Sequence, residues 1–146
     1  MANVRPTPSS GWYFRSMPDG TASGNAPSTG PLLSADGRYL VFESKASNLV
    51  TNDFNGTNDI FIHDHVTHTT SLVSVNADGT ASPNGPSFSP SISEDGLTVA
   101  FVSRATNLVS GITNRAGEIY IRFVAAGKRC WSAAACHSEQ QIPDQS

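Results

Sequence analysis

The chain has 146 residues, enough for one domain; 14% of them are charged, and the net charge is −3. The lack of a Lys/Arg cluster argues against a nucleic-acid partner, and no apolar run is long enough to span a membrane as a helix. With 12 Gly and 9 Pro, the composition is typical of short strands joined by many turns.

The first strand-like run follows a short N-terminal segment. Residues 1–11 contain no apolar core of a signal peptide and are expected to be flexible. Trp12–Ser16 lies 59 residues before Ser71–Val75, and 59 residues is the period on which the chain repeats. We therefore expect residues 12–16 to form the outer strand of a preceding repeat unit.

An internal repeat accounts for most of the chain. Asp19–Asp64 aligns without a gap with Asp78–Phe123, and 21 of the 46 aligned residues are identical. Self-similarity at a fixed period indicates duplication of one structural unit, and such units bury their apolar faces against neighbouring units.

Both copies carry the same strand signals in the same order. A short run ends at an Asp-Gly turn, which is a hairpin signal, and two β-rich apolar runs follow, separated by a polar loop. The paired runs are residues 32–33 and 91–92, 39–42 and 98–101, and 60–62 and 119–121, with 71–75 as a fourth run in the first copy. Four short strands per unit predict an all-β chain of two four-stranded antiparallel propeller blades.

Two sequence motifs recur at the same 59-residue offset. Pro-x-x-Ser-x-Asp-Gly-x-x-x-x-Phe occurs at Pro31–Phe42 and Pro90–Phe101, and Ser-x-Ala-x-Asn-Leu-Val occurs at Ser44–Val50 and Ser103–Val109. Over residues 12–127 these motifs resemble the blade repeat of TolB-like β-propellers, in a long-bladed bacterial form. The resemblance implies a propeller and a periplasmic or extracellular setting, but no single activity, since propellers host many.

The expected organisation is a flexible segment at 1–11, two blades at about 12–75 and 76–127, and a divergent tail at 128–146, of which residues 130–133 could still pair as an edge strand. Two blades cannot close a ring, because propellers have about 4–8. Three explanations stay open: self-assembly, most simply a trimer in which a neighbour's Trp12–Ser16 completes the second blade; a fragment of a longer propeller; or an open two-sheet sandwich.

A calcium site is predicted at Asp53, Asn55 and Asp59. Alternating Asp and Asn oxygens around Gly56 are the ligands that a hard cation such as Ca²⁺ takes. The second copy has lost the first ligand, so only the first copy is expected to bind. The alternative is that Asp53 and Asn55 form Asx turns that order the loop.

A second candidate site consists of His63, His65 and His68. His63 and His65 would share one face of a strand, which allows a zinc site. The second copy lacks these histidines, and solvated outer-strand histidines are the favoured interpretation.

Catalysis has no comparable signature in the sequence. No Gly-x-Ser-x-Gly elbow occurs, and Asp36, Asp78 and Asp95 are explained by Asp-Gly turns. We therefore expect a non-catalytic module that binds a protein or glycan through loops on one rim, with calcium as a stabilising ion. A hydrolase with its active site on the polar rim is the alternative.

Overall fold

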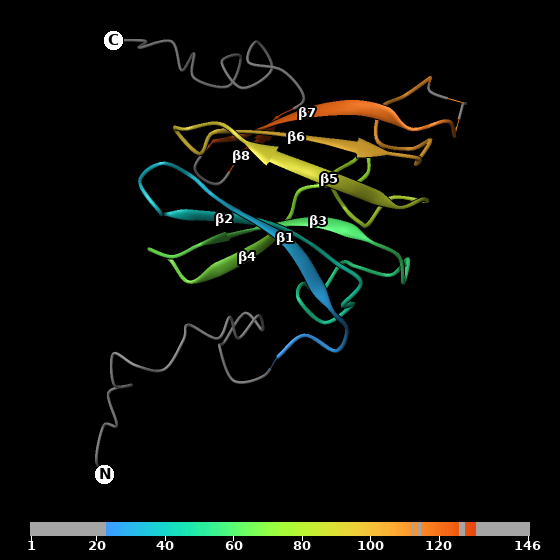
Figure 1. Cartoon of the computed structure of the whole chain (residues 1–146). Coiled ribbons are helices and arrows are strands. Elements are labelled where there is room, and N and C mark those ends of the chain that lie inside the picture. Colours follow the sequence, from blue (N-terminus) through green and yellow to red (C-terminus); the bar gives the residue numbers. More distant parts are fainter. Residues whose placement is uncertain (1–22, 112, 114, 126–127, 131–146) are drawn as a thin grey trace, which may run out of the picture.

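The computed structural model describes residues 23–111, 113, 115–125 and 128–130. They form two four-stranded antiparallel sheets with strand orders β1-β2-β3-β4 and β5-β6-β7-β8 (Figure 1). The strands are β1 Ser28–Leu33, β2 Tyr39–Ser44, β3 Asp59–Asp64, β4 Thr69–Leu72, β5 Ser87–Ile92, β6 Thr98–Ser103, β7 Glu118–Ala125 and β8 Lys128–Cys130. The predicted all-β fold of two blade-like sheets is confirmed. In this part of the chain no helix is long and apolar enough to cross a membrane.

The first hairpin of each sheet turns at the predicted Asp-Gly pair. Gly37 and Gly96 have φ of 70° and 72°, and each donates its N–H at 2.9 Å to the carbonyl of the serine three residues earlier. Glycine adopts this left-handed conformation without steric cost. The hairpins are thus fixed by contacts within a few residues.

The same strands also share a bulge. The β1–β2 register shifts between Thr29 and Leu32, and the β5–β6 register shifts at the equivalent positions. The bulge residue of the first sheet is Gly30, with φ of 61°, whereas Ser89 takes its place in the second, with φ of 54°. The duplication has therefore preserved an irregularity as well as the strands.

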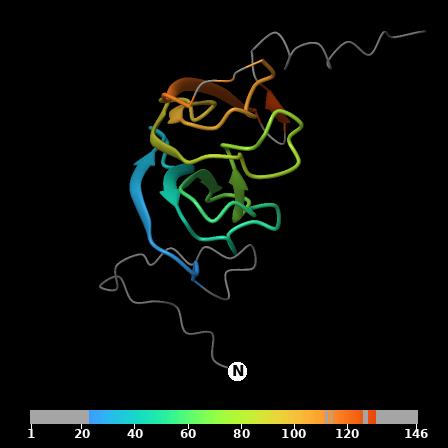
Figure 2. The ribbon, with the colours of Figure 1, turned by 90° about the vertical axis from the view of Figure 1, so that its right-hand side faces the viewer.

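The two sheets stack face to face, with β5 against β1, β2 and β3 (Figures 1 and 2). The apolar residues between them form one core cluster: Tyr39, Val41, Ile60, Ile62, Val73, Val99, Phe101, Ala105, Leu108 and Tyr120. The other face of the first sheet buries a second cluster, in which Phe42 and Phe61 stack with ring centroids 5.7 Å apart. β3 is consequently buried on both faces, as expected of an inner strand in a stack.

Two boundaries differ from the sequence prediction. The fourth strand of the first sheet ends at Leu72, because Val73 and Ser74 both direct their N–H groups to the carbonyl of Ile60 at 2.7 and 3.3 Å and leave the ladder. In the second sheet, β8 pairs with β7 at the outer edge, inside the segment assigned to the tail. The chain therefore supplies the fourth strand expected from a neighbour; Trp12–Ser16 lies outside the described residues.

Candidate functional site

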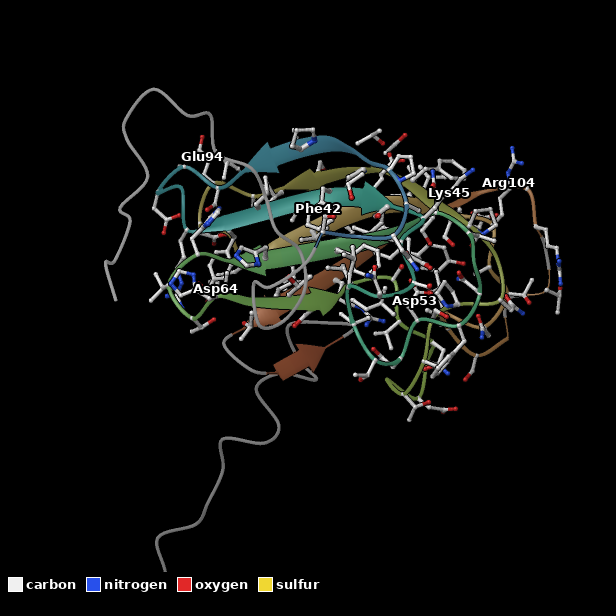
Figure 3. The ribbon with its side chains drawn as sticks, turned by 90° about the horizontal axis from the view of Figure 1, so that it is seen from below. Phe42, Lys45, Asp53, Asp64, Glu94 and Arg104 are labelled. Atoms are coloured by element: carbon white, nitrogen blue, oxygen red, sulfur yellow. The ribbon has the colours of Figure 1, made fainter. Side chains whose placement is uncertain are left out.

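The long loop between β2 and β3 carries the predicted metal ligands. Asp53 and Asn55 lie in the loop, and Asp59 begins β3. Asp53 and Asp59 are buried, with 4% and 0% exposed, and both Asp53 and the Asn55 side chain act on the Asp59 carboxyl group. The structure thus brings the three residues together, at the end of the strands opposite Asp64 (Figure 3).

Asn55 shapes this loop. Its Oδ1 accepts a hydrogen bond from the backbone N–H of Thr57 at 2.9 Å, and Gly56 between them has φ of 62°. This is the Asx turn considered as the alternative interpretation of the motif. The amide nitrogen of Asn55 donates to the carbonyl of Pro83 at 2.9 Å, so the same side chain ties the loop to the segment that leads into the second sheet.

Ser82 strengthens this joint between the sheets. Its N–H donates to the carbonyl of Asn52 at 2.9 Å, and its hydroxyl accepts from the N–H of Phe54 at 2.9 Å. The Asp53 loop and the β4–β5 connection therefore lie side by side on one rim.

Burial dominates the electrostatics of the two carboxyl groups. The pKa of Asp59 is raised to about 7, chiefly by burial; the Ser74 hydroxyl and, to a smaller extent, the Asn55 side chain oppose the shift, and the charge of Asp53 adds to it. Burial also raises the pKa of Asp53, against hydrogen bonds from the Asn55 backbone and Ser82. Each group is therefore held in a place that disfavours its charged form.

Three oxygens at this site are buried and have no hydrogen-bond partner among the described residues: Asp53 Oδ1, Asp59 Oδ2 and Thr57 Oγ1. By contrast, Asp59 Oδ1 accepts from the hydroxyl of Ser74 at 2.8 Å, and that hydroxyl accepts from the N–H of Ile60 at 3.1 Å. The sequence alone did not single out Thr57 or Ser74, because serine and threonine are common in loops and at strand ends, and only the burial of their hydroxyl groups distinguishes these two. Each orphaned polar atom costs about 1–3 kcal/mol.

The histidines do not assemble a metal site. His63 is buried and its Nδ1 lies 3.0 Å from the hydroxyl of Thr70, so the expectation of solvated histidines is wrong for His63, although His65 and His68 are exposed. His63 points into the sheet face that also buries Phe61. Nowhere among the described residues do three His, Cys, Asp or Glu side chains come together to hold a metal ion.

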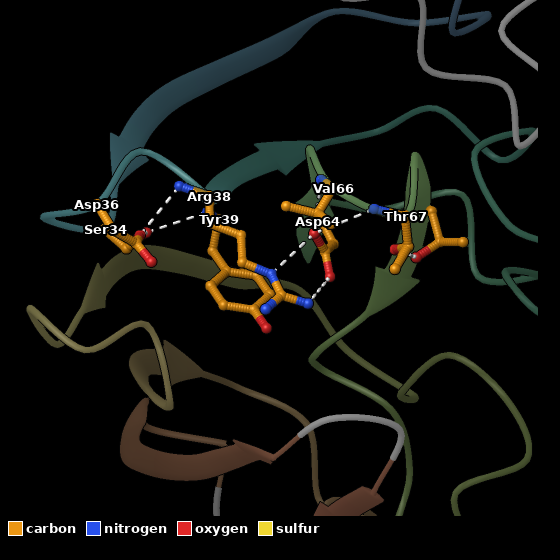
Figure 4. Close-up of polar contacts among 8 residues, drawn as sticks. Ser34, Asp36, Arg38, Tyr39, Asp64, Val66 and Thr67 are labelled. Atoms are coloured by element: carbon orange, nitrogen blue, oxygen red, sulfur yellow. Dashed lines mark hydrogen bonds and ion pairs between the residues drawn. The ribbon is translucent and has the colours of Figure 1, made fainter.

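The opposite rim is held by an ion pair between the two turns of the first sheet (Figure 4). Arg38 donates from Nε and Nη2 to the two oxygens of Asp64, at 3.1 and 2.8 Å. Asp64 also accepts from the N–H of Val66 at 2.8 Å. These hydrogen bonds, above all the one from Arg38, lower the pKa of Asp64 to about 2.

The turn next to this ion pair belongs to Asp36. Its carboxylate accepts from the hydroxyl of Ser34 at 2.6 Å and from the N–H of Arg38 at 3.0 Å. Asp95 makes the equivalent contacts with Ser93 and Leu97 in the second sheet. The Asp-Gly turn interpretation of these two acids is confirmed.

Polar contacts complete the interface between the sheets. Glu43 accepts from the N–H of Ser89 at 2.7 Å, and the buried Arg122 donates to the carbonyl of Val75 at 3.0 Å. Beyond this interface, Ile119 and Ile121 on the far face of the second sheet are 76% and 50% exposed.

No protein-family model and no curated protein matches the chain. Among solved structures, the crystal structure of TolB from Acinetobacter baumannii is similar to 74% of this chain, with 19% sequence identity and a TM-score of 0.43. The chain spans about a fifth of the length of that protein, 21%.

Proposed function

We propose that the chain is a non-catalytic interaction module whose first partner is a second copy of itself, docked blade face to blade face. In this arrangement, the far face of the second sheet in one copy packs on the side of the first sheet in the next copy where strand β1 is exposed. Loops on the two rims are then left to bind a protein or glycan ligand.

The observation that carries this proposal is a contrast between identical residues in the two repeats. Ile60 and Ile62 are 0% and 4% exposed because the second sheet covers them. Their equivalents Ile119 and Ile121 are 76% and 50% exposed. Exposed aliphatic side chains on a sheet face, at positions that the fold elsewhere uses for stacking, mark an interaction surface.

The other half of the interface is exposed on the first sheet. All six residues of β1 are exposed, including Leu33 at 59%, whereas the equivalent Ile92 is partly buried against the inter-sheet core. A Cβ added at Gly37 would meet no atom of the described residues within 4 Å, whereas Gly96 contacts Tyr39 of the preceding sheet. Phe42 and Phe61 on the outer side of the first sheet are already buried within the chain, so the exposed part of this half is strand β1. β1 and the Ile119–Ile121 face thus occupy positions that meet, in equivalent form, at the interface inside the chain.

A second copy is favoured as the occupant because it carries both halves. Such a contact is head-to-tail, and head-to-tail contacts close into a ring when the rotation permits. Three chains would give six blades, within the range of about 4–8 seen in propellers. Because β8 supplies the outer strand of the second sheet, the docking rests on faces and not on an exchanged strand.

Light scattering coupled to size-exclusion chromatography tests the proposal on the full chain. The wild type is expected to have the mass of an oligomer, a trimer in the simplest case. Replacing Ile119 and Ile121 together by serine should shift the mass to the monomer, because two polar side chains then face the apolar partner surface. Val66 is 67% exposed and lies in the turn between β3 and β4, outside the strands that form the two faces. Val66→Ser is therefore the matched control and should leave the mass unchanged.

A wild-type chain that stays monomeric and folded at micromolar concentration would overturn self-association. That result would mean that the faces are covered by another protein, by further blades or by the chain's own terminal segments. Equal masses for the wild type and the double-serine variant, both oligomeric, would show that association uses another surface. The periplasmic or extracellular setting remains an expectation from the repeat motifs.

A further inference from the structure

The oxygens gathered around Asp53 and Asp59 form a group that no other part of the fold explains. Both carboxyl groups are at least nine-tenths buried, yet each leaves one oxygen without a hydrogen-bond partner among the described residues. The hydroxyl oxygen of Thr57, two residues before Asp59 in the chain, is likewise buried and unpaired. Native structures rarely leave buried polar atoms unpaired, so such a group calls for a missing partner.

The missing partner has to be positively charged or has to donate protons. The charge that acts on Asp59 comes from another carboxyl group, Asp53, so side-chain charges do not balance the pair. One shared proton can join two carboxyl oxygens, but it leaves the Thr57 oxygen unsatisfied. A cation can be coordinated by all three oxygens at once.

We propose that Asp53, Asp59 and Thr57 bind one Ca²⁺ ion, with Asn55 beside them. Ca²⁺ takes six to eight oxygen ligands in flexible geometry, and it accepts carboxylates, side-chain carbonyls, backbone carbonyls and water together. Mg²⁺ demands a stricter octahedron and keeps more of its water, and zinc prefers nitrogen and sulfur ligands. An all-oxygen group with two carboxylates therefore favours calcium.

The position of this ion gives it a structural task. The loop that holds Asp53 is hydrogen-bonded to Ser82 and Pro83, which lead into β5, while Asp59 begins β3. An ion at this point ties the loop, the central strand and the connection between the two sheets together. Calcium is thus expected to stiffen the joint between the blades.

The second repeat is not expected to bind an ion. The residues equivalent to Asp53, Thr57 and Asp59 are Ile112, Ala116 and Glu118. Two of the three oxygen donors are therefore absent from the sequence, and the chain should bind one calcium ion.

Calorimetric titration with CaCl₂ and thermal unfolding in calcium or in chelator test the site on the full chain. We expect one ion per chain, and a roughly hundredfold drop in the unfolding equilibrium constant when calcium is present at a hundred times its Kd. MgCl₂ at the same concentration should have a smaller effect. Asp53→Asn, Asp59→Asn and Thr57→Val should each weaken binding.

The matched control is Asp78→Asn, an exposed acid on the same rim, which should bind calcium like the wild type. In chelator, Asp53→Asn should be at least as stable as the wild type, because it removes a buried charge; this separates a lost site from a damaged fold. The Ile119→Ser, Ile121→Ser variant should keep its calcium response, because the site lies within one chain.

Identical melting of the wild type in calcium and chelator overturns the proposal, and so does a full calcium response in Asp53→Asn and Asp59→Asn.

Discussion

Gly96 of the second sheet lies directly against the aromatic ring of Tyr39 in the first. A Cβ at position 96 would stand 3.1 Å from Cε2 of Tyr39 and still closer to Cδ2. Next to this contact, the N–H of Ala35 donates to the carbonyl of Glu94 at 3.0 Å. The Asp-Gly turn of one repeat is therefore also the surface on which the preceding repeat rests.

Gly96→Ala is expected to destabilise the fold more than Gly37→Ala. Both glycines have φ near 70°, so both substitutions carry the backbone cost of about 1–2 kcal/mol. Only Gly96→Ala also drives a methyl group into Tyr39, and overpacking of this kind costs about 1–3 kcal/mol more. Urea unfolding of the two variants measures the difference, and equal losses would show that the sheets do not stack at this contact.

Ser89→Gly is expected to stabilise the fold. Ser89 has φ of 54° in the bulge where the first repeat has Gly30, and its side chain is exposed. Removing the Cβ relieves a conformational cost of about 1 kcal/mol, while the hydrogen bond from the backbone N–H to Glu43 stays. Thermal unfolding should show a higher Tm; the reverse substitution, Gly30→Ser, should lower it.

Stability in chelator is expected to fall as the pH rises from about 4 to 7. The pKa of Asp59 is raised from 3.8 to about 7 in the folded chain, so the folded state binds more protons than the unfolded state in this range, and the slope of stability against pH is negative. The stability that the chain gains from keeping Asp59 protonated is fully present below the unfolded pKa of 3.8 and is lost as the pH rises through about 7. It amounts to a few kcal/mol.

Asp59→Asn is expected to flatten this fall, because the amide does not titrate. Denaturant unfolding at several pH values compares the two proteins. A wild-type stability that rises steadily from pH 4 to 7, and a variant that follows the same curve, would contradict the burial of this carboxyl group.

The pKa of Asp64 is expected to rise in Arg38→Gln. Arg38 is the largest cause of the shift to about 2, and the N–H groups of Val66 and Thr67 contribute less. The pKa should therefore move toward 3.8 without reaching it. Lys45→Gln, at the opposite end of the strands (Figure 3), should leave Asp64 unchanged in a carboxyl NMR titration.

The contribution of this ion pair to stability also changes with pH in a defined direction. Because the folded pKa of Asp64 lies below its unfolded value, the stability it contributes is present above about pH 4 and is lost as the pH falls toward 2. Arg38→Gln should therefore make the chain less sensitive to acid in that window, and an unchanged acid response would mean that the pair adds nothing to stability.

Removal of residues 1–16 separates face docking from strand exchange. The N-terminal run Trp12–Ser16 was expected to complete a neighbour's second blade, but β8 occupies that edge. If docking uses the faces alone, the shortened chain should keep the oligomeric mass in light scattering. A shift to the monomer would show that the N-terminal strand is needed for assembly.

The sequence alone determined the parts of this protein that depend on local contacts. The strand order and the Asp-Gly hairpins follow from residues that lie close together in the chain, such as Ser34, Asp36 and Gly37. The 59-residue period follows from comparing the two copies residue by residue. The motif Asp53-x-Asn55-Gly56 predicted an ordered polar loop for the same reason. The fourth strand of each sheet was less well predicted, because its ends depend on hydrogen bonds to residues far along the chain.

Only the tertiary structure decided which surfaces are covered and which polar atoms have hydrogen-bond partners. Ile60 and Ile119 are the same residue at the same place in the repeat, yet one is fully buried and the other 76% exposed. The orphaned oxygens of Asp53, Thr57 and Asp59 likewise became visible only once burial and hydrogen-bond partners were known. Burial depends on what the neighbouring sheet covers, and a duplicated sequence does not record which of its copies has a neighbour.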